Sequence, residues 1–233
     1  MINQWKVFIG KHRNKIIVAV VIAVLIAILA LFTIATLNKI RSDDYAKSIS
    51  EIKSIKVPLD EYIEAEKTGS IKTSSTALNN ILDKMAKAND LIDAATQKFG
   101  NDSAIKDVSN KFNSLEKWTT KLQDVKDAYD IQAATVLYTD YNKSLDELSK
   151  IHANSSKSKQ IVSDLKSAYQ TYVNDPPETI DDMDKKSVIS AIKNIINARE
   201  ELNKIINNFN EQSSLDELST DYKAYRDSVS KLQ

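Results

Sequence analysis

An uncharged stretch of 22 residues near the N-terminus constrains this chain more than any other feature. Residues 16–37 read IIVAVVIAVLIAILALFTIATL, and only Thr33 and Thr36 among them are polar. A helix rises about 1.5 Å per residue, so this stretch would be about 33 Å long, enough to cross a hydrocarbon core of about 30 Å. A helix in a soluble core is apolar on one face, whereas this one is apolar all round. The sequence therefore predicts a transmembrane helix over residues 16–37.

A cleaved signal peptide is the alternative reading of this stretch. Signal peptides have an apolar segment of about 7–15 residues that ends in an A-x-A-like site. Here the segment is longer, and residues 33–35 offer only a weak match to such a site. We therefore favour a permanent signal-anchor over a cleaved signal.

The residues that flank the span bear on its orientation. The tail, residues 1–15, holds four basic and no acidic residues. Residues 38–53 also hold four basic residues, but acidic residues are mixed with them. The flank with more basic residues usually stays in the cytoplasm, whereas acidic residues have little effect on the orientation of the span. We expect the N-terminus in the cytoplasm and the large domain outside the cell, and the inverted topology is the alternative.

A row of small residues follows one side of the predicted span. Ala19, Ala23 and Ala27 are four residues apart, a spacing that lets two transmembrane helices approach closely. These residues are a candidate packing face for self-association, although alanine is also common in spans that do not associate.

Composition narrows the class of the remaining chain. Three Gly and three Pro in 233 residues favour long helices over sheets with tight turns. The absence of Cys excludes disulfides, thiolate nucleophiles and cysteine zinc sites. The basic residues are 28 Lys and 4 Arg, a bias typical of AT-rich bacterial genomes. Residues 38–233 have a net charge of −4, so we expect no nucleic-acid partner.

Apolar residues recur at spacings of three and four, which predicts bundled helices. Gly100 fits a helix C-terminus, and Asp102 or Ser103 fits the next N-cap, so residues 78–125 predict a helical hairpin. Residues 188–232 predict a second hairpin. The two align without gaps at an offset of 110 residues, and the register continues upstream. Aligned pairs are Ile52 with Val162, Leu59 with Tyr169, Leu78 with Val188, Phe99 with Phe209, Ile105 with Leu215, Phe112 with Tyr222, and Leu122 with Leu232.

These patterns predict an all-α protein, in which the transmembrane helix precedes an elongated helical bundle with two tandem three-helix units. Two unrelated bundles of similar length are the alternative to a repeat. In general plan the units resemble spectrin-type repeats, by length and pattern alone. The predicted organisation is a basic tail at 1–15, the span at 16–37, unit 1 at 43–130, a linking helix and polar linker at 131–157, and unit 2 at 158–233.

Little in the sequence indicates catalysis. Three scattered Gly residues form no phosphate loop, and no metal-ligand spacing is present. We expect no catalytic, metal or cofactor site and no enzyme activity.

Tyrosines are the candidate interaction residues. Each pair lies three residues apart on an apolar helix face, and tyrosine combines apolar area with a hydroxyl that suits an interface. The alternative is that thin bundles use tyrosine at the rim of their own core. The pairs are Tyr138 with Tyr141, Tyr169 with Tyr172, and Tyr222 with Tyr225.

The leading functional hypothesis is a non-enzymatic, single-pass membrane protein. It would present an extracellular interaction or scaffold domain at a bacterial cell surface, with the bilayer and either a partner protein or a second copy as partners. Three alternatives are an extracellular sensor that works with a separate effector, a cytosol-facing scaffold, for example in division, and a mobile-element exclusion or immunity protein.

Overall fold

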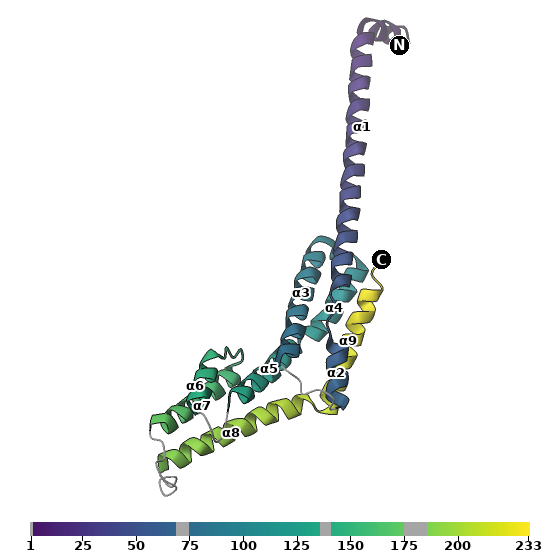
Figure 1. Cartoon of the computed structure of the whole chain (residues 1–233). Helices are drawn as coiled ribbons and strands as arrows, with labels where there is room; N and C mark the ends of the chain where they lie inside the picture. Colours follow the sequence, from purple (N-terminus) through teal and green to yellow (C-terminus); the bar gives the residue numbers. More distant parts are fainter. Residues whose placement is uncertain (1, 69–74, 136–140, 175–185) are drawn as a thin grey trace. The chain divides into compact units, whose positions relative to one another are not determined.

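The computed structural model describes residues 2–68, 75–135, 141–174 and 186–233, and for residues 2–25 and 27 it describes the backbone alone. All secondary structure in these ranges is helical (Figure 1), which confirms the predicted all-α fold. The helices are α1 (Ile2–Ser54), α2 (Leu59–Thr68), α3 (Ser75–Phe99), α4 (Ser103–Glu116), α5 (Thr119–Ala134), α6 (Tyr141–Lys150), α7 (Ser156–Asn174), α8 (Lys186–Phe209) and α9 (Gln212–Ser230).

The chain divides into two compact units, Met1–Ser50 and Glu51–Gln233. The first is a continuous stretch of helix α1. Among the residues whose side chains are described, no helix carries an apolar segment long enough to cross a membrane. Residues 16–25 and 27 of the predicted span, and with them Ala19, Ala23 and Ala27, lie outside the described side chains.

A proline ends the first helix of the second unit. Helix α1 stops at Ser54, residues 55–57 are not helical, and Pro58 leads into α2. Proline disfavours helix in the residue before it but is tolerated at a helix start, where its missing N–H is not needed. Asp60 and Glu61 in the first turn of α2 favour the positive end of its dipole.

The hairpin of α3 and α4 follows the predicted turn. Gly100 directly follows α3, and a Cβ there would lie 2.5 Å from the Thr96 carbonyl oxygen, so only glycine fits. Asp102 is the N-cap of α4, where its Oδ1 accepts hydrogen bonds from the backbone N–H of Ala104 and Ile105 at 2.9 and 3.0 Å. The prediction of Asp102 as an N-cap is therefore confirmed.

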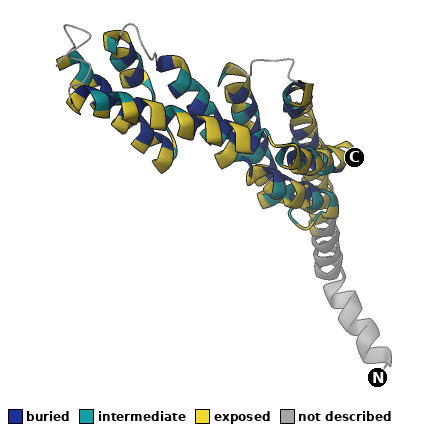
Figure 2. Ribbon diagram, turned by 90° about the horizontal axis from the view of Figure 1, so that it is seen from below, coloured by how far each residue is buried: buried dark blue, intermediate teal, exposed yellow. Residues whose placement is uncertain are grey.

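Burial follows the 110-residue offset. Figure 2 shows the buried residues of the helices facing their neighbours and the exposed residues facing outward. Helices α3 and α8 cover equivalent residues, and α4 lies within the range equivalent to α9. Aligned residues that are buried in both halves are Leu78 and Val188, Phe99 and Phe209, Ile105 and Leu215, Phe112 and Tyr222, and Leu122 and Leu232.

The pairing of the helices does not follow the order of the two halves. Helix α3 packs along α4 and α5, as a hairpin requires, but α9 has little contact with its hairpin partner α8. Instead α9 packs against α4 and α2, while α8 packs against α5 and α7. The second hairpin is open, and its last helix completes the packing of the first half (Figure 1).

A buried carboxylate on α5 holds the connection between α6 and α7 by a hydrogen bond. Asp127 on α5 is 1% exposed. Its Oδ2 accepts the backbone N–H of Asn154 at 2.7 Å, and its Oδ1 accepts the Gln123 amide at 2.9 Å. Asn154 lies in the short connection between α6 and α7, so this carboxylate supplies an acceptor that the connection would otherwise lack.

Replacement of Asp127 tests this role. We expect Asp127→Ala to lower the free energy of unfolding by about 2–3 kcal/mol, because the buried carboxylate accepts charge-assisted hydrogen bonds from the Asn154 N–H and the Gln123 amide, and the variant loses both. The matched control is Asp146→Ala, which removes an exposed ion pair with Lys150 that solvent screens, so its loss should be clearly smaller. Denaturant unfolding followed by circular dichroism measures both. Equal losses in the two variants would contradict the assignment.

Candidate functional site

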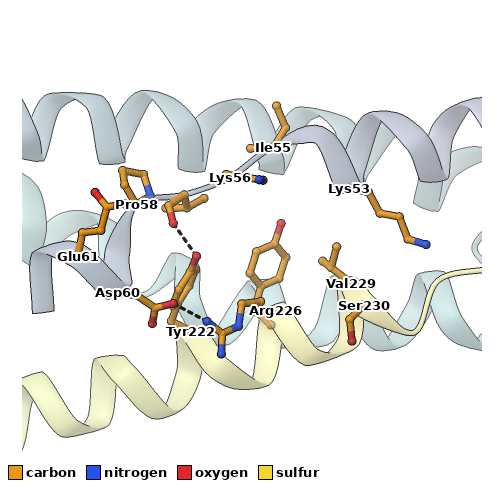
Figure 3. Close-up of a pocket in the computed structure, with 12 residues that line it drawn as sticks. Lys53, Ile55, Lys56, Pro58, Asp60, Glu61, Tyr222, Arg226, Val229 and Ser230 are labelled. Carbon is orange, nitrogen blue, oxygen red and sulfur yellow. Dashed lines mark hydrogen bonds and ion pairs between the residues drawn. The ribbon is translucent and has the colours of Figure 1, made fainter. Parts of the chain in front are cut away.

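A groove lies where α9 crosses the connection between α1 and α2. Figure 3 shows the residues that line it, and its volume is about 460 Å³. One wall is the end of α1, the extended residues 55–57 and the first turn of α2, and the other is the last turns of α9. The lining residues are Lys53, Ile55, Lys56, Val57, Pro58, Asp60, Glu61, Tyr222, Tyr225, Arg226, Val229 and Ser230.

Three polar contacts fasten the two walls together. The Tyr222 hydroxyl donates to the Val57 carbonyl at 2.5 Å, in a buried position that satisfies an extended backbone group. Arg226 pairs with Asp60 at 2.5 Å, but both side chains are about half exposed, so solvent screens this pair. Lys53 Nζ donates to the Leu232 carbonyl at 2.5 Å. The Tyr222 bond is therefore the firmest of the three polar contacts.

One hydroxyl of the groove is left without a partner. Tyr225 is 3% exposed, and its ring packs edge-on against Phe112 at a centroid distance of 5.3 Å. Its hydroxyl is buried and finds no hydrogen-bond partner among the described residues. Burial, with a smaller effect from neighbouring Tyr222, raises the Tyr225 pKa to about 12. The hydroxyl therefore stays protonated at neutral pH and can donate a hydrogen bond.

Charge is distributed along the groove. Figure 3 places Glu61 and Asp60 at the end nearest Pro58 and Lys53 at the other end, with Lys56 between. Among the described residues Lys56 forms no ion pair, and Lys53 donates to a neutral carbonyl. The groove thus has an acidic end, where Asp60 is already paired, and a basic end whose charge no carboxylate of the described residues balances.

The structure separates the candidate tyrosines into two groups. Tyr138 lies outside the described residues. Tyr141 on α6 contacts Tyr172 and Tyr169 on α7, at ring-centroid distances of 3.9 and 5.7 Å, and Tyr169 is fully buried. Tyr222 and Tyr225 line the groove on α9. The candidates therefore do not gather on one face, and their rings are largely taken up in helix packing.

A second buried hydroxyl lies on the other side of α2. Tyr62 is 4% exposed and its hydroxyl has no partner among the described residues. Burial and the nearby Glu66 carboxylate raise its pKa well above the usual value of 10.0. Its ring packs near Phe209 at 6.3 Å, and it lines a small cavity of about 150 Å³ with Pro58 and Ala77.

The groove could not be predicted from the sequence. The lining residues come from segments about 165 residues apart, which no local pattern connects. In the described ranges no group of three His, Asp or Glu side chains is placed to hold a metal ion. The chemistry that the groove offers is hydrogen bonding and charge, without a nucleophile paired to a base.

No family model, curated protein or solved structure matches the chain.

The two groove tyrosines differ in one testable way. We expect Tyr222→Phe to lower the free energy of unfolding by about 1–2 kcal/mol, because the Val57 carbonyl loses its buried donor. We expect Tyr225→Phe to leave stability unchanged or slightly raised, because its hydroxyl is buried without a partner. Thermal or denaturant unfolding of both variants measures this contrast. A larger loss in Tyr225→Phe than in Tyr222→Phe would contradict the geometry.

Proposed function

We propose that this chain is a non-enzymatic, single-pass membrane protein of a bacterial cell surface, with residues 16–37 in the bilayer. The helical domain outside the cell acts as an interaction or scaffold module for a partner protein or a second copy. The observation that carries this proposal is the uninterrupted helix from Ile2 to Ser54, within which the uncharged stretch lies.

The described part of that stretch supports the anchor by its exposure. Successive residues of a helix are about 100° apart, so the exposed apolar side chains between residues 28 and 37 point in all directions around the axis. A helix that is apolar all round is buried in a large protein or in a membrane. The exposed side chains are Ile26, Ile28, Leu29, Leu31, Phe32, Ile34 and Leu37, each between 55% and 72% exposed.

The arrangement of apolar and charged faces in the second unit supports an interaction role. Its helices bury one apolar stripe each, and the outward faces carry mixed Lys, Asp and Glu side chains. The repeat at an offset of 110 residues supports two related three-helix segments as its origin, with α9 exchanged onto the first. Such a bundle offers a folded surface for a partner, and among the described residues no group of three His, Asp or Glu side chains is placed to hold a metal ion.

A sensor is the second candidate function, and the groove favours it. A ligand in the groove would contact both the connection that follows α1 and the helix α9, which packs on α2 and α4. Binding there would bias the geometry of the connection, and a separate effector would read the change.

Charges introduced into the span test the anchor. The double variant Leu29→Lys/Phe32→Lys places two charges in the proposed hydrocarbon core, at about 2.5–3.5 kcal/mol each. We expect the wild type to remain in the membrane fraction after alkaline carbonate extraction and the double variant to be largely released. The matched control is Ile40→Lys, which lies outside residues 16–37 and should remain bound. A wild type in the soluble fraction, or a mature N-terminus just after Ala35, would overturn the anchor.

Single cysteines test the orientation, because the chain has none of its own. Ser149→Cys places a thiol on an exposed residue of α6, and Asn3→Cys places one in the tail. A membrane-impermeant maleimide applied to intact cells should label Ser149→Cys only, and both should react after lysis. Labelling of Asn3→Cys alone in intact cells would reverse the topology and favour a cytosol-facing scaffold.

A further inference from the structure

We propose that the groove between residues 53–61 and α9 binds a small organic carboxylate with an apolar body. The groove lies wholly within the unit Glu51–Gln233, so the proposal does not depend on the membrane anchor.

The first argument is the unpartnered hydroxyl of Tyr225. A buried polar group without a partner costs about 1–3 kcal/mol, and such groups in folded proteins are few. Tyr225 lines the groove and its hydroxyl is buried without a partner among the described residues, while the Tyr222 hydroxyl is satisfied by the Val57 carbonyl. A ligand oxygen that reaches the Tyr225 hydroxyl would accept the hydrogen bond that no described residue accepts.

The second argument is charge. Arg226 is paired with Asp60, which leaves Lys53 and Lys56 as the cations of the groove that no described carboxylate balances. Glu61 lies at the opposite end from Lys53 (Figure 3). A carboxylate is therefore favoured near Lys53 and Lys56, where an ammonium group can donate to it, and Tyr225 of the same groove lining adds a phenol donor. A cationic ligand would meet Lys53 and Lys56 there and is disfavoured.

The third argument is the shape and lining of the groove. Its volume of about 460 Å³ falls within the range of about 300–1,000 Å³ that is usual for small-molecule sites. Ile55, Val57, Pro58 and Val229 give it apolar walls between the charged ends. A carboxylate that carries an aromatic ring or a branched alkyl group would cover these walls and keep its charge at the lysines.

Ligand-observed saturation-transfer NMR on the full-length chain tests the proposal. The chain is used in phosphatidylcholine nanodiscs, or free in buffer if it proves soluble, and the probes are phenylacetate and 4-methylpentanoate. Empty nanodiscs control for partition into lipid, and phenylacetamide controls for apolar contact alone. We expect at least one acid to bind at millimolar concentration or better, and the amide to bind about tenfold more weakly.

Matched variants locate the site. Tyr225→Phe should weaken binding of the acid about tenfold without lowering the melting temperature, whereas Tyr172→Phe should not change binding. Lys56→Gln should weaken binding about threefold, and Lys223→Gln, on α9 but outside the groove lining, should not. The proposal is overturned if neither acid binds the wild type, if acid and amide bind equally, or if Tyr225→Phe binds as well as the wild type.

Discussion

The packing of α9 against α4 and α2 is the contact on which the second unit depends. This 19-residue helix buries Leu215, Leu218, Tyr222 and Tyr225, and Leu232 follows it in the core. A fully buried side chain of this size contributes about 1.5–3 kcal/mol, so one helix supplies a stabilisation comparable with the whole net stability of a domain, about 5–15 kcal/mol. The Trp118 indole N–H, which donates to Asp221 at 2.9 Å, ties α9 to the bend between α4 and α5.

The packing of α9 on α4 and α2 makes the two halves of the sequence interdependent. In the first half α3 packs against α4 and α5. In the second half α8 packs against α5 and α7 and has little contact with α9. At the end of α8 the chain already contacts the first half, because the Phe209 ring lies near the rings of Trp118 and Tyr62, at centroid distances of 6.2 and 6.3 Å. A unit cut between the halves would expose the apolar faces of α4 and α9 at once.

The packing of α9 beside the connection between α1 and α2 also forms the groove. Pro58 interrupts the helix, so residues 55–57 leave the regular helical hydrogen-bond pattern and the Val57 carbonyl needs a donor from elsewhere. Helix α9 covers them and satisfies the Val57 carbonyl through Tyr222. Because α9 alone covers residues 55–57, the groove remains between them. Tyr225 lines it, and its hydroxyl is buried. The groove thus follows from a proline in one half and a helix from the other.

The sequence by itself determined the helical class, the turn at Gly100 and Asp102, and the apolar faces that the helices of the second unit bury. Each of these depends on neighbours within one or two turns of helix, and periodicity and capping chemistry record them directly. The same periodicity placed Tyr222 and Tyr225 on an apolar helix face, but it did not indicate which residues they contact. Only the tertiary structure decided that α9 leaves α8, that Tyr222 meets Val57, and that Asp127 holds the connection at Asn154. An apolar stripe fits any complementary stripe, so the choice among partners depends on the summed packing of helices far apart in the chain.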